Sequence, residues 1–156
     1  MTTLPLSIII LAAGKGTRMK SDKAKVLHEV FYAPMVHHVI QATLPLRPAQ
    51  TIVIVGHQQS SVEEALISFE VDFVVQTEQL GTGHAVLVAE NAIDEETDTV
   101  MILCGDTPLV RTETLQAMYS FHQQQGASLT LMTTVLETPT NYGRIICDNN
   151  DRILGI

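Results

Sequence analysis

The stretch SIIILAAGKGTRM, residues 7–19, decides the fold of this chain. Residues 7–13 form a short segment, apolar after Ser7 and rich in isoleucine, which predicts a strand buried on both faces. A polar glycine loop follows, to about residue 24. Strands buried on both faces occur where helices cover both sides of a parallel sheet, so we expect an α/β fold.

The pattern beyond this stretch alternates between strand and helix. Buried strands are predicted for residues 51–55, 71–75 and 99–104. Helices are predicted for residues 35–42, 60–68, 82–91 and 112 to about 124, and Gly126 ends the last of them. A capping box is predicted at Ser60 or Ser61, and a side-chain cap at Thr112. The fold class is therefore Rossmann-like α/β, with a mostly parallel sheet and helices on both of its faces.

The last third of the chain departs from this alternation. Further strands are predicted for residues 128–136, 144–147 and 152–156, with a turn at residues 148–151. Such a succession predicts an antiparallel or mixed edge toward the C-terminal end. No repeat or linker interrupts the sequence, so we expect residues 1–156 to belong to one domain.

Composition excludes several classes of protein. Hydrophobic residues make up 46% and charged residues 17%, as in globular proteins. The net charge of −8 argues against general binding of nucleic acid, and no apolar run approaches the ~18 residues of a membrane span. Cys104 and Cys147 match no metal-binding spacing. We interpret them as free thiols of a cytoplasmic protein, although two cysteines could still pair.

Positive charge is concentrated in the glycine loop. Five of the nine Lys and Arg residues lie between Lys15 and Lys25. The loop does not match a dinucleotide fingerprint, because Met19 stands at the third glycine position, and it lacks the Gly-Lys-Ser/Thr of a P-loop. Glycines that admit a phosphate and side chains that neutralise it still fit a compact anion. The alternative is a solvated basic loop.

Two more polar residues lie where a parallel sheet binds its ligands, beyond the carboxyl ends of the strands. Gln76 follows the predicted strand 71–75, and Asp106 follows the strand 99–104. Each residue alone has a simpler interpretation: Gln76 as an ordinary polar residue at a strand end, and Asp106 as a cap or turn residue ahead of Pro108.

Four motifs in order change that interpretation: LAAGKGTRM (residues 11–19), EQLGTGHA (78–85), GDTPL (105–109) and YGRI (142–145). Together with KVLH (25–28) and PMVHHV (34–39), they closely resemble the uridylyltransferase domain of the bifunctional N-acetylglucosamine-1-phosphate uridylyltransferase/glucosamine-1-phosphate acetyltransferase. The resemblance covers the whole chain, and EQLGTGHA is its most specific part.

The resemblance implies a role for each matching residue. Arg18 and Lys25 are the implied catalytic residues, and Asp106 is the implied ligand of Mg²⁺. Uracil is held by Gln76, Gly81 and Thr82. The other implied substrate contacts are Leu11, Ala12, Ala13, Gly14, Cys104, Gly105 and, beside the sugar, Gly143. Because Gln76 could flip to suit cytosine, we expect the fixed loop at Gly81 to discriminate between bases. His28 and His84 are expected to be structural.

The chain departs from the family pattern at three positions. Ala24 stands where the family usually has proline, Tyr32 where it usually has glycine, and Cys104 where it often has tyrosine. The first change loosens the loop through backbone entropy. The third removes an aromatic wall from the expected sugar-nucleotide site.

The implied reaction transfers UMP from UTP to N-acetylglucosamine 1-phosphate and releases pyrophosphate, a step in making precursors of the peptidoglycan that maintains cell shape. The family domain continues beyond Ile156 with a glutamate for the sugar and an asparagine for the metal, so we expect a nucleotidyltransferase domain that is incomplete at its C-terminal end. The acetyltransferase β-helix and the homotrimer of the full-length family are not expected here. Two alternatives remain: a cytidylyl- or guanylyltransferase, and an inactive nucleotide-binding module.

Overall fold

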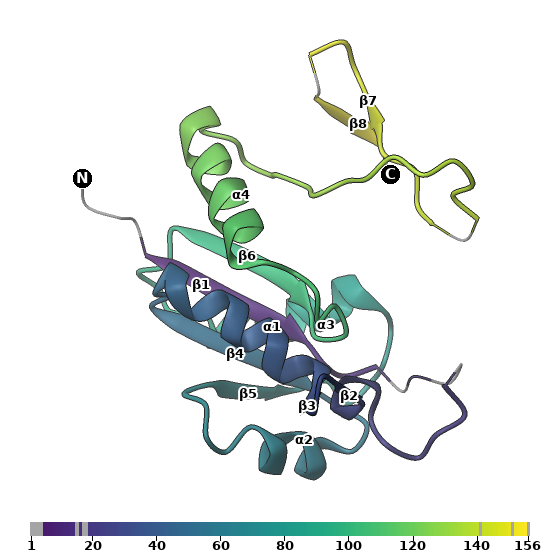
Figure 1. Ribbon diagram of the computed structural model, residues 1–156. Helices are drawn as coiled ribbons and strands as arrows, with labels where there is room; N and C mark the ends of the chain where they lie inside the picture. Colours follow the sequence, from purple (N-terminus) through teal and green to yellow (C-terminus); the bar gives the residue numbers. More distant parts are fainter. Residues whose placement is uncertain (1–4, 15, 17–18, 141, 151, 156) are drawn as a thin grey trace. The chain divides into compact units, whose positions relative to one another are not determined.

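Strand β1 (Leu6–Leu11) is a central strand of a four-stranded sheet in the computed structural model, which describes residues 5–14, 16, 19–140, 142–150 and 152–155. The sheet order is β5-β4-β1-β6, and every pairing in it is parallel (Figure 1). The other strands are β4 (Gln50–Val55), β5 (Asp72–Val75) and β6 (Thr99–Cys104). The predicted parallel sheet is therefore confirmed.

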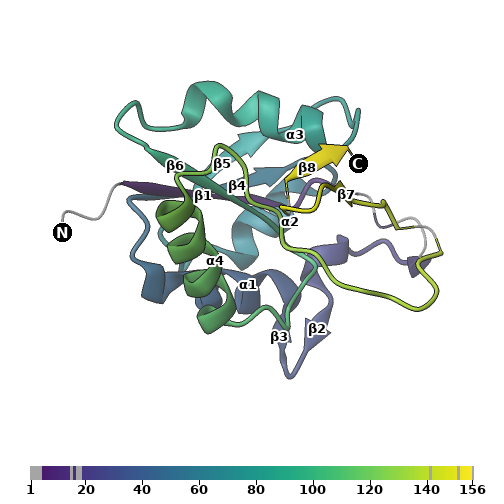
Figure 2. The ribbon, with the colours of Figure 1, turned by 90° about the horizontal axis from the view of Figure 1, so that it is seen from above.

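Helices cover both faces of this sheet, as predicted. Helix α1 (Met35–Thr43) lies on one face and α3 (Thr82–Ala89) on the other (Figure 2). Ala85 and Ala89 of α3 pack with the sheet residues Ile9 and Ile54. Small side chains bring α3 close to the strands, and this closeness positions its N-terminus beside their carboxyl ends.

Helix α1 is amphipathic. Its buried residues, spaced three and four apart, are Met35, Val36, Val39, Ile40 and Thr43. The helix begins at Met35, directly after Pro34, which is its N-cap residue and has no side-chain hydrogen bond to the helix. Shorter elements complete the first part of the chain: η2 (Lys25–Leu27), β2 (Glu29–Val30), β3 (Ala33–Pro34), η3 (Leu44–Leu46), α2 (Gln59–Ala65) and η4 (Glu90–Ala92).

The turn between β2 and β3 has two left-handed residues. Phe31 and Tyr32 have φ of 50° and 64°, and their side chains are 78% and 99% exposed. Such φ values at both central positions are typical of a tight hairpin turn, where glycine or asparagine is usual. Tyr32 therefore keeps the turn at a steric cost of about 1–2 kcal/mol that a glycine would avoid.

Both capping predictions are wrong, although both helices exist. Helix α2 is preceded by the left-handed residue Gln58 and has no side-chain cap, because the chain leaves β4 in a turn closed by a bond from the Gln59 amide to the Gly56 carbonyl. Helix α4 (Thr112–Gln125) begins at Thr112 as predicted. The Thr112 hydroxyl, however, donates to the Ala42 carbonyl at 2.9 Å and so ties α4 to α1.

The chain divides into two compact units, Met1–Ala117 and Met118–Ile156, each described by itself. In the second unit, α4 ends before Gly126, which has a φ of 55° as its helix-stopping role requires. Strands β7 (Ile146–Cys147) and β8 (Ile153–Gly155) form an antiparallel hairpin. The expected antiparallel pairing toward the C-terminal end is thus present, as a separate two-stranded sheet.

The predicted strand at residues 128–136 is wrong. These residues form no strand in the structure, and the side chains of Leu129 and Val135 are 61% and 99% exposed. An apolar pattern alone does not make a strand, because the backbone N–H and C=O groups also need a partner. No helix among the described residues is long and apolar enough to cross a membrane.

Candidate active site

A cavity of about 480 Å³ opens at the carboxyl ends of the strands in the first unit. This is where an open α/β sheet binds its ligands, and the volume suits a small molecule. The residues that line it are Leu11, Ala13, Gly14, Gly16, Met19, Lys25, Val26, Gln76, Gln79, Gly81, Thr82, Ala85, Cys104 and Asp106.

Most of the residues that the sequence predicts as a site meet in this cavity. Those that line it are Leu11, Ala13, Gly14, Lys25, Gln76, Gly81, Thr82, Cys104 and Asp106. They come from segments up to 95 positions apart, as the separation between residues 11 and 106 shows, so the sheet is what assembles them. The cavity thus brings together residues of LAAGKGTRM, KVLH, EQLGTGHA and GDTPL, whereas PMVHHV contributes none.

Two predicted residues lie behind the lining. Ala12 is buried, and its amide donates to the Ile54 carbonyl at 2.9 Å, which continues the sheet. The Gly105 amide donates to the Leu11 carbonyl at 3.0 Å, and a Cβ at Gly105 would lie only 3.1 Å from that oxygen. Because Gly105 has no side chain, the loop after β6 packs closely on β1, and the next residue, Asp106, lies in the cavity lining.

Two other predicted residues cannot be placed in the cavity. Arg18 lies outside the described residues, so its catalytic role stays a prediction. Gly143 belongs to the second unit, which is described by itself, and its contact with the sugar also stays a prediction.

The side of the cavity where we expect phosphates, the phosphate side, carries two opposite charges. Lys25 Nζ donates to Asp106 Oδ2, joining residues 81 positions apart, and the two side chains are 38% and 28% exposed. Gly16 has a φ of 60°, and a Cβ there would lie 2.8 Å from Lys25 Cβ. The glycine therefore leaves the space through which the Lys25 side chain reaches the carboxylate.

Cys104 lies at the end of β6, next to this pair. Burial raises the pKa of its thiol above the ordinary value of 9.0; the Asp106 carboxylate raises it further and the Lys25 ammonium partly opposes them. The thiol is therefore neutral near pH 7. Both cysteines are free, as predicted.

The residues on the side of the cavity where we expect the nucleotide base, the base side, are held in place by neutral hydrogen bonds. The backbone N–H of Gln76 donates to the Val55 carbonyl at 2.8 Å. Gln76 is 5% exposed, and its side-chain Nε2 lies 3.2 Å from the Gly81 carbonyl oxygen and 3.0 Å from His84 Nδ1. Gln79 Nε2 donates to the Ala13 carbonyl at 2.7 Å, which joins the base loop to the glycine loop. Gly81 has a φ of 105°, a conformation that essentially only glycine adopts.

The motifs and the fold together identify the family. Residues 8–144 match the MobA-like NTP transferase domain. The chain belongs to this family.

The family assignment agrees with the sequences of relatives. The chain is 57% identical over 152 residues to the "Bifunctional protein GlmU" of Desulfotalea psychrophila, covering 97% of this chain and 45% of the relative. This similarity confirms the resemblance stated from the motifs. The chain spans less than half the length of that relative.

Solved structures of relatives share the fold. A nucleotidyl transferase from Methanothermobacter has a TM-score of 0.67 and 26% identity, covering 74% of this chain and 57% of that one. Rv0371c of Mycobacterium tuberculosis, solved as a complex with manganese, has a TM-score of 0.65 and 20% identity, covering 77% and 60%.

Sequence reasoning missed five lining residues of this MobA-like domain: Gly16, Met19, Val26, Gln79 and Ala85. All of them belong to the motifs LAAGKGTRM, KVLH or EQLGTGHA, so the motifs themselves were the available signal. A motif does not say which of its members face a ligand, because that depends on the turn each loop makes.

The cavity of this MobA-like domain offers one carboxylate to a metal ion. The described residues contain no group of three His, Cys, Asp or Glu side chains that could hold a metal. Asp106 nevertheless presents a hard oxygen ligand in the cavity, beside the loop expected to bind phosphates. Mg²⁺ commonly binds through one or two carboxylates, with substrate phosphates and water completing its shell. The residues present therefore fit a metal that arrives with its nucleotide.

Proposed function

We propose that this chain binds UTP and transfers its UMP group to N-acetylglucosamine 1-phosphate, giving UDP-N-acetylglucosamine and pyrophosphate. The observation that carries the proposal is the single cavity that combines the charged pair Lys25–Asp106 with the hydrogen-bonded base loop of Gln76 and Gly81. The similarity to the bifunctional relative favours this nucleotide and this acceptor.

The glycine loop and Lys25 are proposed to bind the triphosphate. Gly14 and Gly16 line the cavity and leave room for phosphate oxygens beside the backbone. The Lys25 ammonium donates charge-assisted hydrogen bonds to those oxygens. Arg18 is proposed to add a second cation from the same loop.

The chemical step needs little from the protein beyond alignment and charge. An oxygen of the sugar phosphate, already anionic, forms a bond to the α-phosphorus of UTP, and the bond from that phosphorus to the pyrophosphate oxygen breaks. No proton has to be removed from the nucleophile, so no general base is required. Lys25 stabilises the charge that develops on the phosphoryl oxygens.

Mg²⁺ is the proposed metal, with Asp106 as its protein ligand. When bound, it neutralises the phosphate oxygens of the nucleotide. Gly143 is proposed to contact the sugar, and the protein is proposed to act in the cytoplasm. The acetyltransferase domain and the trimer remain properties expected of the full-length family and are not proposed for this chain.

Calorimetric titration with UTP, CTP and GTP in the presence of Mg²⁺ tests the nucleotide. We expect UTP to bind most tightly, and tighter binding of CTP or GTP would contradict the proposal. Release of pyrophosphate from UTP and N-acetylglucosamine 1-phosphate tests the reaction, with the full-length Desulfotalea relative assayed beside it. Binding of UTP without release of pyrophosphate would instead support a nucleotide-binding module.

A further inference from the structure

The side chain of Gln76 is fixed in one orientation before any nucleotide binds. Its Nε2 lies 3.2 Å from the Gly81 carbonyl oxygen and 3.0 Å from His84 Nδ1. The amide group has two N–H bonds, and these two contacts use both of them. The carbonyl oxygen Oε1 is therefore the part of the amide that remains for a ligand.

The Gly81 carbonyl excludes the reverse orientation. A flipped amide would direct Oε1 at the Gly81 carbonyl oxygen, bringing two acceptors together. In the orientation that remains, Gln76 Nε2 donates to His84 Nδ1, which accepts in the tautomer that carries its proton on Nε2. His84 in that tautomer adds a second bond to the orientation that the Gly81 carbonyl sets.

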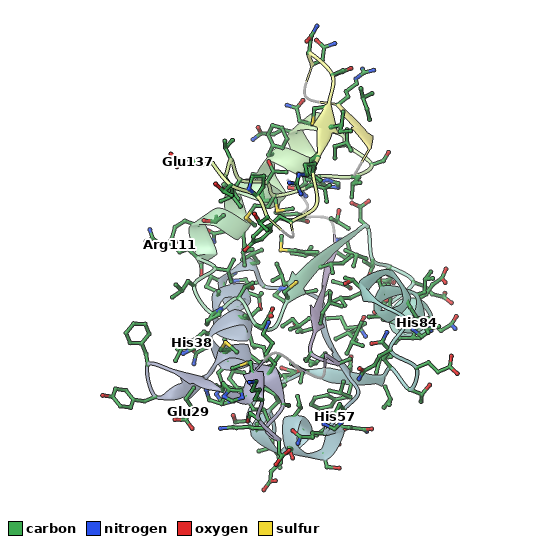
Figure 3. The ribbon with its side chains drawn as sticks, turned by 90° about the vertical axis from the view of Figure 1, so that its right-hand side faces the viewer. Glu29, His38, His57, His84, Arg111 and Glu137 are labelled. Carbon is green, nitrogen blue, oxygen red and sulfur yellow. The ribbon has the colours of Figure 1, made fainter. Side chains whose placement is uncertain are left out.

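Oε1 is also not sealed inside the protein. The described residues have one fully buried side-chain polar atom without a hydrogen-bond partner, His28 Nε2, and Gln76 Oε1 is not such an atom. Gln76 lines the cavity, while His84 approaches it from α3, on the opposite side of the sheet from His38 (Figure 3).

We propose that His84 is a positioning residue for base selection: by accepting from Gln76 Nε2, it reinforces the orientation that the Gly81 carbonyl sets, in which Gln76 presents a hydrogen-bond acceptor to the base, and so favours uracil over cytosine. This inference deepens the proposed function and rests on it. It also changes the interpretation of the site, since the sequence predicts that Gln76 flips freely and that His84 is only structural.

The chemistry of the bases supports the choice of uracil. Uracil presents the N3–H donor beside the O4 acceptor, which matches Oε1 beside a backbone N–H such as that of Gly81. In the same pose cytosine presents the N3 acceptor and the N4 amino group, so each hydrogen bond becomes a clash of like groups. Guanine carries the same N–H and carbonyl pair as uracil, so this contact distinguishes the pyrimidines, and the larger ring must be excluded by space.

Two variants of His84 test the inference in the intact chain. His84→Leu removes the acceptor, whereas His84→Asn retains an oxygen close to the position of Nδ1. Binding of UTP and of CTP, each with Mg²⁺, is measured by calorimetry. We expect the ratio of the two affinities to fall at least about fivefold in His84→Leu and to stay near the original value in His84→Asn. A general disturbance of α3 would weaken both nucleotides alike and leave the ratio unchanged.

A double variant shows whether His84 acts through Gln76. In a Gln76→Leu background, His84→Leu should not change the ratio further. An unchanged ratio in the single variant His84→Leu, or an equal fall with and without Gln76, would overturn the inference. If the unaltered chain binds CTP as tightly as UTP, the proposed function is wrong. If the unaltered chain prefers UTP and the His84→Leu variant keeps the same preference, only the proposed role of His84 is wrong.

Discussion

The two sides of the cavity are prepared for a ligand in different ways. On the base side, neutral hydrogen bonds hold Gln76 and Gln79 in place. On the phosphate side, Lys25 and Asp106 are bonded to each other. Under the proposed function, the base side can bind its ligand without rearrangement, whereas the charged pair has to separate before Lys25 reaches a phosphate and Asp106 a metal ion.

This difference suggests why the metal and the triphosphate should bind together. While the cavity holds neither, the ammonium and the carboxylate neutralise each other and avoid the cost of an unpaired charge in a half-buried site. A triphosphate that takes Lys25 leaves Asp106 free, and a metal ion that takes Asp106 leaves Lys25 free. Each ligand therefore lowers the cost of binding the other.

The largest expected effect comes from breaking the phosphate side at its cation. Lys25→Ala should weaken binding of UTP with Mg²⁺ by about 1.5–3 kcal/mol, because a charge-assisted bond is lost. Lys23→Ala is a matched control: Lys23 carries the same charge in the same loop but pairs with Glu29 at 3.7 Å, outside the cavity lining. Calorimetry should show little change in the control. Equal losses of affinity in both variants would mean that the basic residues form a solvated loop that attracts anions in general and not a specific phosphate site.

An intermediate effect, with opposite signs under two conditions, is expected from Asp106→Asn. With Mg²⁺ present, UTP should bind several-fold more weakly, since the metal loses its carboxylate ligand. With a chelator present, UTP should bind more tightly than to the original chain, because Lys25 no longer has to leave a carboxylate. Titrations with and without Mg²⁺ measure both. A change of the same sign in the two titrations would refute the coupling through this pair.

The smallest expected effect comes from disturbing the base side through its backbone. A Cβ at Gly81 would meet no atom within 4 Å, so Gly81→Ala reports the strain of a φ of 105° alone, about 1–2 kcal/mol of folding free energy. Gly83→Ala also adds a Cβ in open space, but inside α3 with an ordinary φ, and should be neutral or slightly stabilising. Thermal unfolding and UTP binding compare the two. Equal stabilities would show that the base loop is not strained.

The sequence predicted well the local elements of structure and the residues that belong to recognisable motifs. The buried strand predicted for residues 7–13 exists, as Leu6–Leu11, and residues of EQLGTGHA line the cavity as expected, because a short apolar strand and a glycine-dependent turn are determined by neighbours along the chain. It failed at residues 128–136, where the apolar pattern is present but the partner strand is not.

The contacts that define the two sides of the cavity could not be predicted. Lys25 and Asp106 are 81 positions apart, and their pairing depends on the order of strands in the sheet. The contacts that orient Gln76 come from the Gly81 carbonyl and from His84 on α3, and they depend on how α3 packs beside the end of β5. Neither contact can be inferred from the composition of the chain or from the spacing of its residues.

The position of β1 has a consequence for how the protein is made. Strand β1 is synthesised before either of its partners, which are residues 50–54 on one edge and 99–104 on the other. Until those residues have been synthesised, Ile8, Ile9 and Ile10 have no strand to pair with, and an uncharged β-branched segment in that condition tends to associate with other chains. Pairings between such distant residues also make folding slow. The nascent chain is therefore most exposed to aggregation, until β6 has been synthesised, at residues that later become fully buried.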